Sequence, residues 1–146
     1  MKIGFIGIGV MGWPMAANIL KGGHELTVFD LDRAAAQRFA SEVGGKAAAS
    51  VAELADAEVV VTMLPTSKHV RQALAEDEDG AFLKAIRPGL IVIDMSSSEP
   101  GDTRALGPVL AERGATLIDA PVSGARPRAI SGTLALMIGG DDEAAT

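Results

Sequence analysis

Three glycines near the amino terminus have the spacing of a phosphate-binding loop. Gly7, Gly9 and Gly12 form the pattern G-x-G-x-x-G, directly after an apolar segment and at the start of a predicted helix. Gly7 permits a tight turn, Gly9 leaves room for a pyrophosphate, and Gly12 lets helix and strand pack closely. The amides of Val10 and Met11 are expected to point, with the helix dipole, at the phosphates. The pattern favours a dinucleotide site over a glycine-rich turn that binds nothing.

An acidic residue stands where such a site needs one. Asp30 ends the second apolar segment, about twenty residues beyond the glycines, where a carboxylate hydrogen-bonds the ribose hydroxyls of NAD. This carboxylate would repel the extra phosphate of NADP, and the next residue, Leu31, is not basic. Arg33 is either an exposed helical residue or a guanidinium that meets that phosphate. We therefore expect NAD as the cofactor and keep NADP as the alternative.

Apolar segments alternate with helical ones along the chain, which is typical of a doubly wound α/β fold. The predicted strands are Lys2–Ile6, Glu25–Phe29, Lys46–Ala48, Glu58–Met63, Leu90–Asp94, Ala115–Ile118 and Leu134–Ile138. The predicted helices are Met11–Lys21, Asp32–Glu42, a segment capped by Ser50 and Glu53, a segment from Ser67, and Pro100–Arg113. We expect residues 1–146 to form one Rossmann-like domain with a mainly parallel sheet.

Two segments interrupt this pattern. Pro108 follows Gly107 in the middle of the last predicted helix, and an interior proline removes a hydrogen bond and clashes with the carbonyl four residues earlier. We expect a kink or break near Arg104–Pro108. The acidic run Glu76–Gly80 is expected to be a solvated loop.

The composition restricts the class of function. The formal net charge is −6, and the 13 Lys and Arg residues form no basic stripe, so neither nucleic acid nor an anionic membrane is an expected partner. The sequence has no Cys, which excludes disulfides, thiolate catalysis and zinc–sulfur sites, and we expect no metal site. His24 and His69 are expected to be surface residues. No apolar run is long enough to span a bilayer, and the first carries glycines, so we expect a cytoplasmic protein.

Several ordered motifs resemble a known family. The segment Gly4–Ala16, GFIGIGVMGWPMA, resembles the opening of the β-hydroxyacid dehydrogenases. This family includes 3-hydroxyisobutyrate dehydrogenase and tartronate semialdehyde reductase and is related to 6-phosphogluconate dehydrogenase. The further motifs are Thr62–Pro65, Asp94–Ser97, Asp119–Gly124, Gly132–Leu134 and Gly139–Gly140. The resemblance implies an oxidoreductase that transfers hydride between a nicotinamide cofactor and a small β-hydroxy acid or its semialdehyde.

The resemblance also implies roles for single residues. It places Leu64 and Pro65 against the dinucleotide and Ser97 near the nicotinamide, where the residues alone would indicate a strand-ending turn and a helix cap. It implies that Ser123 and Gly124 bind the substrate carboxylate, which suits a loop that can present amides to an anion. The residues expected to bind the cofactor are Gly7, Ile8, Gly9, Val10, Met11, Gly12, Asp30, Leu64, Pro65 and Ser97.

The loop after Gly124 departs from the commonest family pattern. Ala125 and Arg128 stand where the family most often has glycine, and the segment Arg126–Ile130 is more similar to the tartronate semialdehyde reductases. Arg126 and Arg128 either contact a second anionic group of the substrate or belong to a solvated loop.

In this family the general acid/base is a lysine on a helix beyond the nucleotide domain, with an asparagine nearby. None of the five lysines of this sequence lies in that motif, so we expect no catalytic residue within residues 1–146. The resemblance implies a helical, catalytic and dimer-forming domain outside this chain and a homo-oligomer at full length. The alternatives are a dinucleotide-binding or redox-sensing module without catalysis, and an imine reductase with another residue in place of the lysine.

Overall fold

The computed structural model contains a six-stranded parallel sheet, and it describes residues 1–123, 129, 131 and 135–136. The strand order is β3-β2-β1-β4-β5-β6, and every neighbouring pair is parallel. The strands are β1 (Lys2–Ile6), β2 (Glu25–Phe29), β3 (Lys46–Ala47), β4 (Val59–Thr62), β5 (Ile91–Asp94) and β6 (Thr116–Asp119). Each lies within one residue of its predicted bounds, and the order is that of the Rossmann fold, which confirms the expected class.

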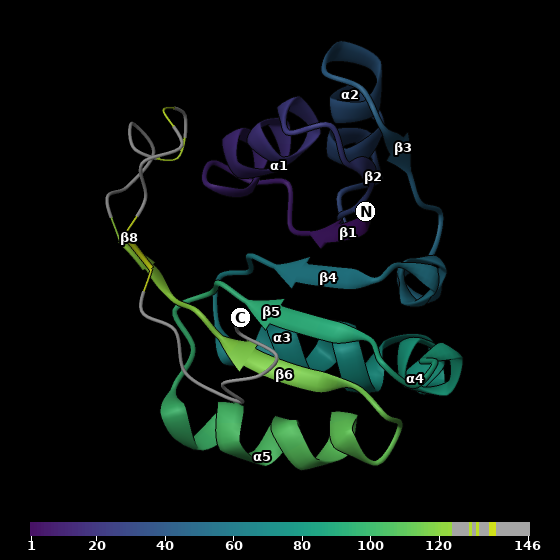
Figure 1. The fold of residues 1–146 in the computed structure, drawn as a ribbon, viewed down its shortest axis with the longest axis vertical. Coiled ribbons are helices and arrows are strands. Elements are labelled where there is room, and N and C mark those ends of the chain that lie inside the picture. Colours follow the sequence, from purple (N-terminus) through teal and green to yellow (C-terminus); the bar gives the residue numbers. More distant parts are fainter. Residues whose placement is uncertain (124–128, 130, 132–134, 137–146) are drawn as a thin grey trace.

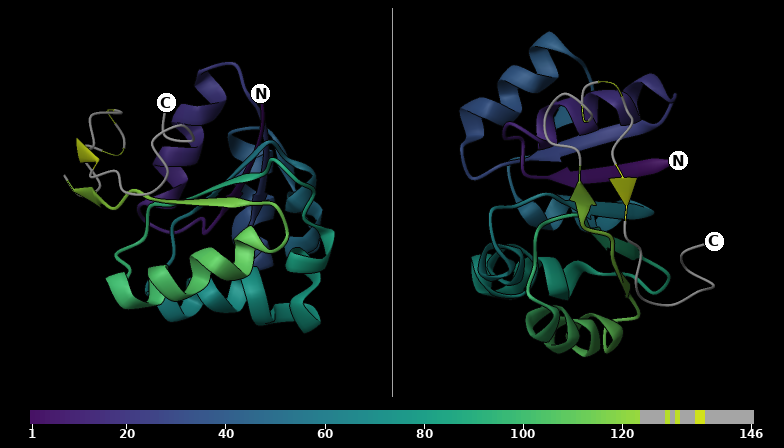
Figure 2. Two further views of the ribbon diagram at one scale, coloured as in Figure 1. Left: turned by 60° about the horizontal axis from the view of Figure 1, so that its bottom comes forward. Right: turned by 90° about the vertical axis from the view of Figure 1, so that its left-hand side faces the viewer.

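Helices cover both faces of the sheet (Figure 1, Figure 2). On one face lie α1 (Gly12–Lys21) and α2 (Arg33–Glu42). On the other lie α3 (Ser67–Arg71), α4 (Asp77–Ala85) and α5 (Pro100–Ala111), with the π-helical turn η2 (Gln72–Glu76) between the first two. Parallel neighbours need such crossover connections, because each strand must start again at the same edge of the sheet. Among the described residues, no helix is both long and apolar enough to cross a membrane.

The sheet separates two buried clusters. Val60 and Val61 are neighbours in β4 and point to opposite faces, as the two-residue period of a strand requires. The cluster around Val60, beneath α3 to α5, includes Val51, Leu54, Val70, Leu74, Phe82, Val92, Leu106 and Leu110. The cluster around Val61, beneath α1 and α2, includes Ile3, Phe5, Met15, Ala16, Leu26, Val28, Ala36 and Phe39. Burial on both faces explains why the central strands are continuous apolar runs in the sequence.

The single tryptophan of the sequence joins α1 to α2. The Trp13 ring meets Phe39 edge to face, with 5.1 Å between ring centroids and an angle of 76° between ring planes. The Arg38 guanidinium lies 5.8 Å from the centroid of the Trp13 ring, a cation–π contact. Because Trp13 is the second residue of α1, its fluorescence reports on the loop that precedes this helix.

The predicted cap at Ser50 is found, with different partners. Its Oγ accepts a hydrogen bond from the Ala52 amide (3.2 Å), and the Glu53 carboxylate accepts one from Ala49 (3.0 Å) instead of Ser50. The segment that follows is the short 3₁₀ helix η1 (Val51–Asp56). A capping box spans three residues in both bonds, whereas here the Ser50 bond spans two residues and the Glu53 bond spans four.

The expected break in the last helix was wrong, because α5 is continuous from Pro100 to Ala111 with Pro108 inside it. Gly107 precedes the proline and lacks the Cβ that would clash with the proline ring. Leu106 and Leu110 flank the pair and are buried in the core. Packing of these leucines therefore compensates for the missing hydrogen bond.

The acidic run does turn the chain, although hydrogen bonding assigns most of it to α4. Glu78, Asp79 and Gly80 have left-handed φ angles of 55°, 57° and 72°. Both acidic side chains of this turn are exposed, as expected of a solvated segment.

The last predicted strand does not extend the parallel sheet. Its described part, β8 (Ala135–Leu136), pairs antiparallel with β7 (Val122–Ser123) as a separate two-stranded ribbon. This ribbon lies beside the carboxyl ends of the main strands (Figure 1). Ala129 is buried, and its carbonyl accepts a hydrogen bond of 2.7 Å from the Asn18 side chain in α1.

The proline in α5 gives a stability prediction. Pro108→Ala should raise the free energy of unfolding by at least about 1 kcal/mol, because it restores a helical N–H and removes a ring clash that together cost about 3 kcal/mol. Pro108 is exposed, so little packing is lost. Urea denaturation measures the change. The control Pro100→Ala, at the first position of the same helix, should give no gain. A lower free energy of unfolding for Pro108→Ala would contradict the conclusion that Pro108 costs stability and that packing of the leucines compensates for it.

Candidate functional site

The strand order reverses between β1 and β4, and the loops after these two strands meet there. In open α/β sheets the ligand crevice lies at this position, beyond the carboxyl ends of the strands. The meeting is close: a Cβ on Gly7 would lie 2.2 Å from the carbonyl oxygen of Met63. Gly7 also has a φ of 105°, which side chains rarely allow. Glycine is therefore required at position 7 for two independent reasons.

The other two glycines of the loop differ in what surrounds them. A Cβ on Gly12 would lie 1.7 Å from the Gly7 carbonyl oxygen, so helix α1 can start against the loop only without a side chain. A Cβ on Gly9 would meet no protein atom within 4 Å. Gly12 is thus needed for the fold, whereas the space beside Gly9 is open to a ligand.

The carboxylate of Asp30 joins the end of β2 to the glycine loop. Its Oδ2 accepts a hydrogen bond from the Ile8 amide (2.7 Å), and its Oδ1 accepts one from the Asp32 amide (2.8 Å). The Ile8 side chain is buried, so this residue contributes its amide to the loop and its side chain to the core. A carboxylate has about four lone-pair sites, so Asp30 keeps acceptor capacity for a ligand.

The glycine loop, Asp30 and the turn after β4 line one hollow of about 420 Å³. Its lining residues are Gly7, Gly9, Val10, Met11, Gly12, Asp30, Leu31, Met63, Leu64, Pro65 and His69. The walls are apolar side chains and glycine backbone, with Asp30 and His69 as the ionisable groups. This suits a ligand with flat apolar rings joined by a phosphate linker.

A buried polar network fixes the loop after β4. Asp94 is 2% exposed and accepts hydrogen bonds from the hydroxyls of Thr62 (2.9 Å) and Ser98 (2.6 Å) and from the Ser96 amide (3.0 Å). Ser96 Oγ in turn accepts the amide of Leu64 (2.8 Å). The ends of β4 and β5 are therefore held as one unit.

The sequence analysis singled out Ser97 from the loop after β5 and missed the role of Ser96. Ser97 is exposed, whereas Ser96 is fully buried. The aspartate was the available signal, because an Asp side chain commonly accepts the backbone amide two residues later, here that of Ser96. The bond between Ser96 Oγ and the Leu64 amide joins two separate strand ends and has no local sequence signal.

A second carboxylate lies beside Asp94. Asp119 ends β6 and is paired with Asp94 in the sheet register. Burial raises the pKa of Asp119 above its ordinary value of 3.8, and the neighbouring Asp94 raises it further. Its Oδ1 is buried and has no partner among the described residues.

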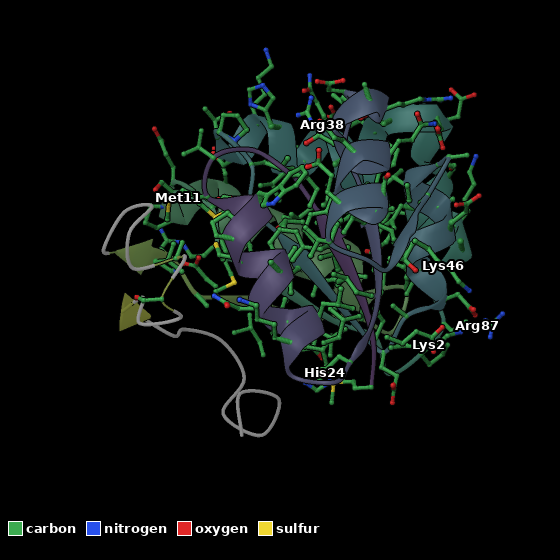
Figure 3. The ribbon with its side chains drawn as sticks, turned by 90° about the horizontal axis from the view of Figure 1, so that it is seen from above. Lys2, Met11, His24, Arg38, Lys46 and Arg87 are labelled. Carbon is green, nitrogen blue, oxygen red and sulfur yellow. The ribbon has the colours of Figure 1, made fainter. Side chains whose placement is uncertain are left out.

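Another hollow, of about 250 Å³, lies at the opposite edge of the sheet. It is lined partly by Lys2 and Lys46, the first residues of β1 and β3. Figure 3 shows Met11 at one end of the molecule and Lys2, Lys46 and Arg87 at the other. Lys2 and Arg87 each lie 3.1 Å from an oxygen of Asp56, and the hydrogen bond from Lys2 chiefly holds the pKa of Asp56 below its usual value. These cations are paired at the amino ends of the strands, away from the expected ligand edge.

The structure brings most of the predicted cofactor residues together. Eight of the ten line the hollow, Ile8 supports it through its amide, and Ser97 lies exposed on the next loop. Ser123 is in β7, and Gly124, Arg126 and Arg128 lie outside the described residues, so the substrate site stays a prediction. His69 is exposed as expected, yet it also lines the hollow. Within the described part of the chain, no group of three or more His, Asp or Glu could hold a metal ion.

Comparison with known proteins finds a matching family and similar relatives. Residues 2–146 match the family described as the NAD binding domain of 6-phosphogluconate dehydrogenase. The NAD-dependent L-serine dehydrogenase of Pseudomonas aeruginosa is 44% identical over 144 residues, which are 98% of this chain and 47% of the relative.

Two solved structures agree in fold. The 3-hydroxyisobutyrate dehydrogenase of Mycobacterium tuberculosis, solved with L-serine, has a TM-score of 0.90 and 38% identity over 99% of this chain and 48% of its own. An imine reductase of Streptomyces aurantiacus has a TM-score of 0.86 and 27% identity, over 99% of this chain and 49% of its own. The chain thus spans about half the length of the relatives that it matches.

The carboxylate pair gives a prediction for the pH dependence of stability. Because the pKa of the Asp119 carboxyl is higher in the folded state than in the unfolded state, the carboxyl favours folding at a pH below its unfolded-state pKa. This contribution to stability is lost as the pH rises through the folded-state pKa. Asp119→Asn should therefore have a higher melting temperature than the unsubstituted chain at pH 7. The difference should shrink as the pH falls towards about 4. Glu25→Gln, which removes an exposed carboxylate, controls for net charge. A pH-independent or negative difference for Asp119→Asn would contradict the assigned pKa direction.

Proposed function

The chain belongs to the family of NAD-binding domains of 6-phosphogluconate dehydrogenase, and from that premise we propose that it binds NAD across the carboxyl ends of β2, β1 and β4. The observation that carries the proposal is the open space beside Gly9, inside a hollow that the glycine loop, Asp30 and the Leu64–Pro65 turn share. The pyrophosphate lies in that space and accepts hydrogen bonds from the Val10 and Met11 amides at the start of α1.

The strand order gives the bound cofactor its direction. Asp30 follows β2, so the adenosine ribose lies on that side and donates its hydroxyls to the free lone pairs of the carboxylate. Leu64 and Pro65 follow β4, and Ser97 follows β5, so the nicotinamide lies on the opposite side. The Asp94–Ser96 network holds the Leu64 amide in place and thereby positions this wall of the site.

The same residues favour NAD over NADP. Asp30 and Asp32 both stand at the turn after β2, where the ribose phosphate of NADP would meet their negative charge. Arg33, the first residue of α2, is exposed. NADP could still bind if the Arg33 guanidinium pairs with the ribose phosphate.

We propose that the whole protein oxidises a small hydroxy acid, or reduces its semialdehyde, with this cofactor. When bound, NAD supplies a hydride acceptor. The support lies in relatives named for L-serine and 3-hydroxyisobutyrate, both small carboxylates with a hydroxyl group. Ser123 and Gly124 would bind the carboxylate. The proton acceptor, the homo-oligomer contacts and the cytoplasmic location stay predictions. The imine reductase alternative has weaker support, because that neighbour shares 27% identity against 44% for the dehydrogenase.

Titration with NADH tests the proposed function, with Trp13 as the probe. The emission of Trp13 overlaps the absorption of NADH, so binding next to α1 should quench it. The unsubstituted chain should bind NADH more tightly than NADPH. Gly9→Ala should fold with unchanged stability, because its methyl meets no protein atom, and should bind NADH at least about tenfold more weakly.

Gly101→Ala, at an open position in α5, controls for a glycine replacement away from the hollow. Absence of NADH binding by the folded, unsubstituted chain would contradict the proposal. Full affinity in Gly9→Ala would contradict the position given to the pyrophosphate.

A further inference from the structure

The ribbon of β7 and β8 needs support from the rest of the molecule to keep its position. It has two register pairs, Val122 with Leu136 and Ser123 with Ala135, and it forms a sheet of its own. An isolated two-stranded hairpin is marginally stable at best in water. The contacts of this part of the chain with the main domain therefore decide where the ribbon lies.

Helix α1 supplies such a contact at Ala129, which lies between the two ribbon strands in the sequence. Ala129 is 1% exposed and belongs to the buried cluster beneath α1. Its carbonyl accepts the 2.7 Å hydrogen bond from the Asn18 side chain, which is 111 residues away in the sequence. Val122, in β7, packs against the same cluster. The chain is thus anchored on the α1 face of the sheet both before and after Ser123.

The hydrogen bond adds a direction that the packing lacks. Ala129 offers only a methyl group to the cluster, and apolar packing is non-directional. A hydrogen bond, by contrast, prefers a narrow range of distances and angles. Loss of the Asn18 donor would also leave a carbonyl of a buried residue without this partner, which is unfavourable. Asn18 therefore sets the orientation of the chain at Ala129.

The helix that holds Ala129 is also the helix that meets the dinucleotide. Met11 lines the hollow and precedes the first residue of α1. Asn18 follows Met11 by seven residues, and residues seven apart lie on the same face of a helix. One rigid helix therefore connects the cofactor hollow with the ribbon that carries Ser123.

We propose that Asn18 is a positioning residue for the substrate: through Ala129 it holds the ribbon so that Ser123 receives the carboxylate of a small hydroxy acid at a fixed place relative to the cofactor. The inference rests on the proposed function and adds to it the residue that connects the two ligand sites. Asn18 is not among the described residues that line the dinucleotide hollow, so it acts through Ala129.

Replacement of the Asn18 amide by a carboxylate tests the anchor in the 146-residue chain. Asn18→Asp keeps the shape of the side chain but has no N–H donor when ionised. It should move the amide resonances of Ser123 and Ala129, leave those of residues 7–12 in place, and keep the NADH affinity within about twofold. Asn18→Gln keeps a donor and should move the resonances less. Gln37→Glu, the same amide-to-carboxylate change at an exposed position of α2, is the control.

Kinetics of the full-length protein then separate positioning of the substrate from a general effect on structure. The substrates are NAD with either L-serine or 3-hydroxyisobutyrate. Asn18→Asp should raise the KM of the acid about tenfold, the size of one hydrogen bond, and leave kcat and the KM of NAD unchanged. Asn18→Gln should recover part of the lost affinity for the acid, and Gln37→Glu should behave like the unsubstituted protein.

The outcomes distinguish this inference from the function on which it rests. If the protein oxidises an acid with NAD and Asn18→Asp leaves its KM unchanged, the role of Asn18 is wrong and the proposed function stands. Unmoved resonances of Ser123 and Ala129, or an equal rise of both KM values, would also overturn it. If the unsubstituted protein binds NADH but oxidises neither acid, the substrate class and the role of Asn18 are both wrong, while NAD binding stands. If it does not bind NADH, the proposed function fails as well.

Discussion

The site depends on the absence of side chains at two positions of one loop. Gly7 must pass within contact distance of the Met63 carbonyl, and Gly12 must start α1 against the Gly7 carbonyl. Either contact would be impossible with a Cβ, because the added atom would lie 2.2 Å or 1.7 Å from an oxygen. These contacts bring the ends of β1 and β4 together at the reversal of the strand order. The crevice is a consequence of this close packing, and Gly9 lies at its open side.

Two hydrogen-bonded carboxylates connect the ends of β1 and β4 to the ends of the neighbouring strands β2 and β5. Asp30 holds the glycine loop to the end of β2 through the Ile8 amide, and Asp94 holds the end of β4 to that of β5 through Thr62 and Ser96. Each carboxylate therefore joins neighbouring strands at the ligand edge. The difference between them is access: Asp94 is buried and serves the structure, whereas Asp30 borders the hollow and can also meet a ligand.

The sequence predicted the features that depend on local pattern. β-branched runs such as Val59–Thr62 marked the strands, and the glycine spacing marked the loop, because both patterns act over a few residues. Pro108 was misjudged, since the tolerance of α5 for it depends on the preceding Gly107 and on leucines packed against a distant strand. His69 was identified only as a surface residue. Its place in the hollow follows from the packing of α3 beside the end of β2, which no local pattern contains.

The central claim is that the ligand edge is formed by the carboxyl ends of the strands. Amide chemical-shift mapping of the isotope-labelled chain during an NADH titration tests it most directly. The account predicts the largest changes at the amides of residues 7–12, 30–32 and 63–65, with little change around Lys2 and Lys46. Changes concentrated in the hollow between Lys2 and Lys46 would contradict it, because NADH would then bind at the amino ends of the strands.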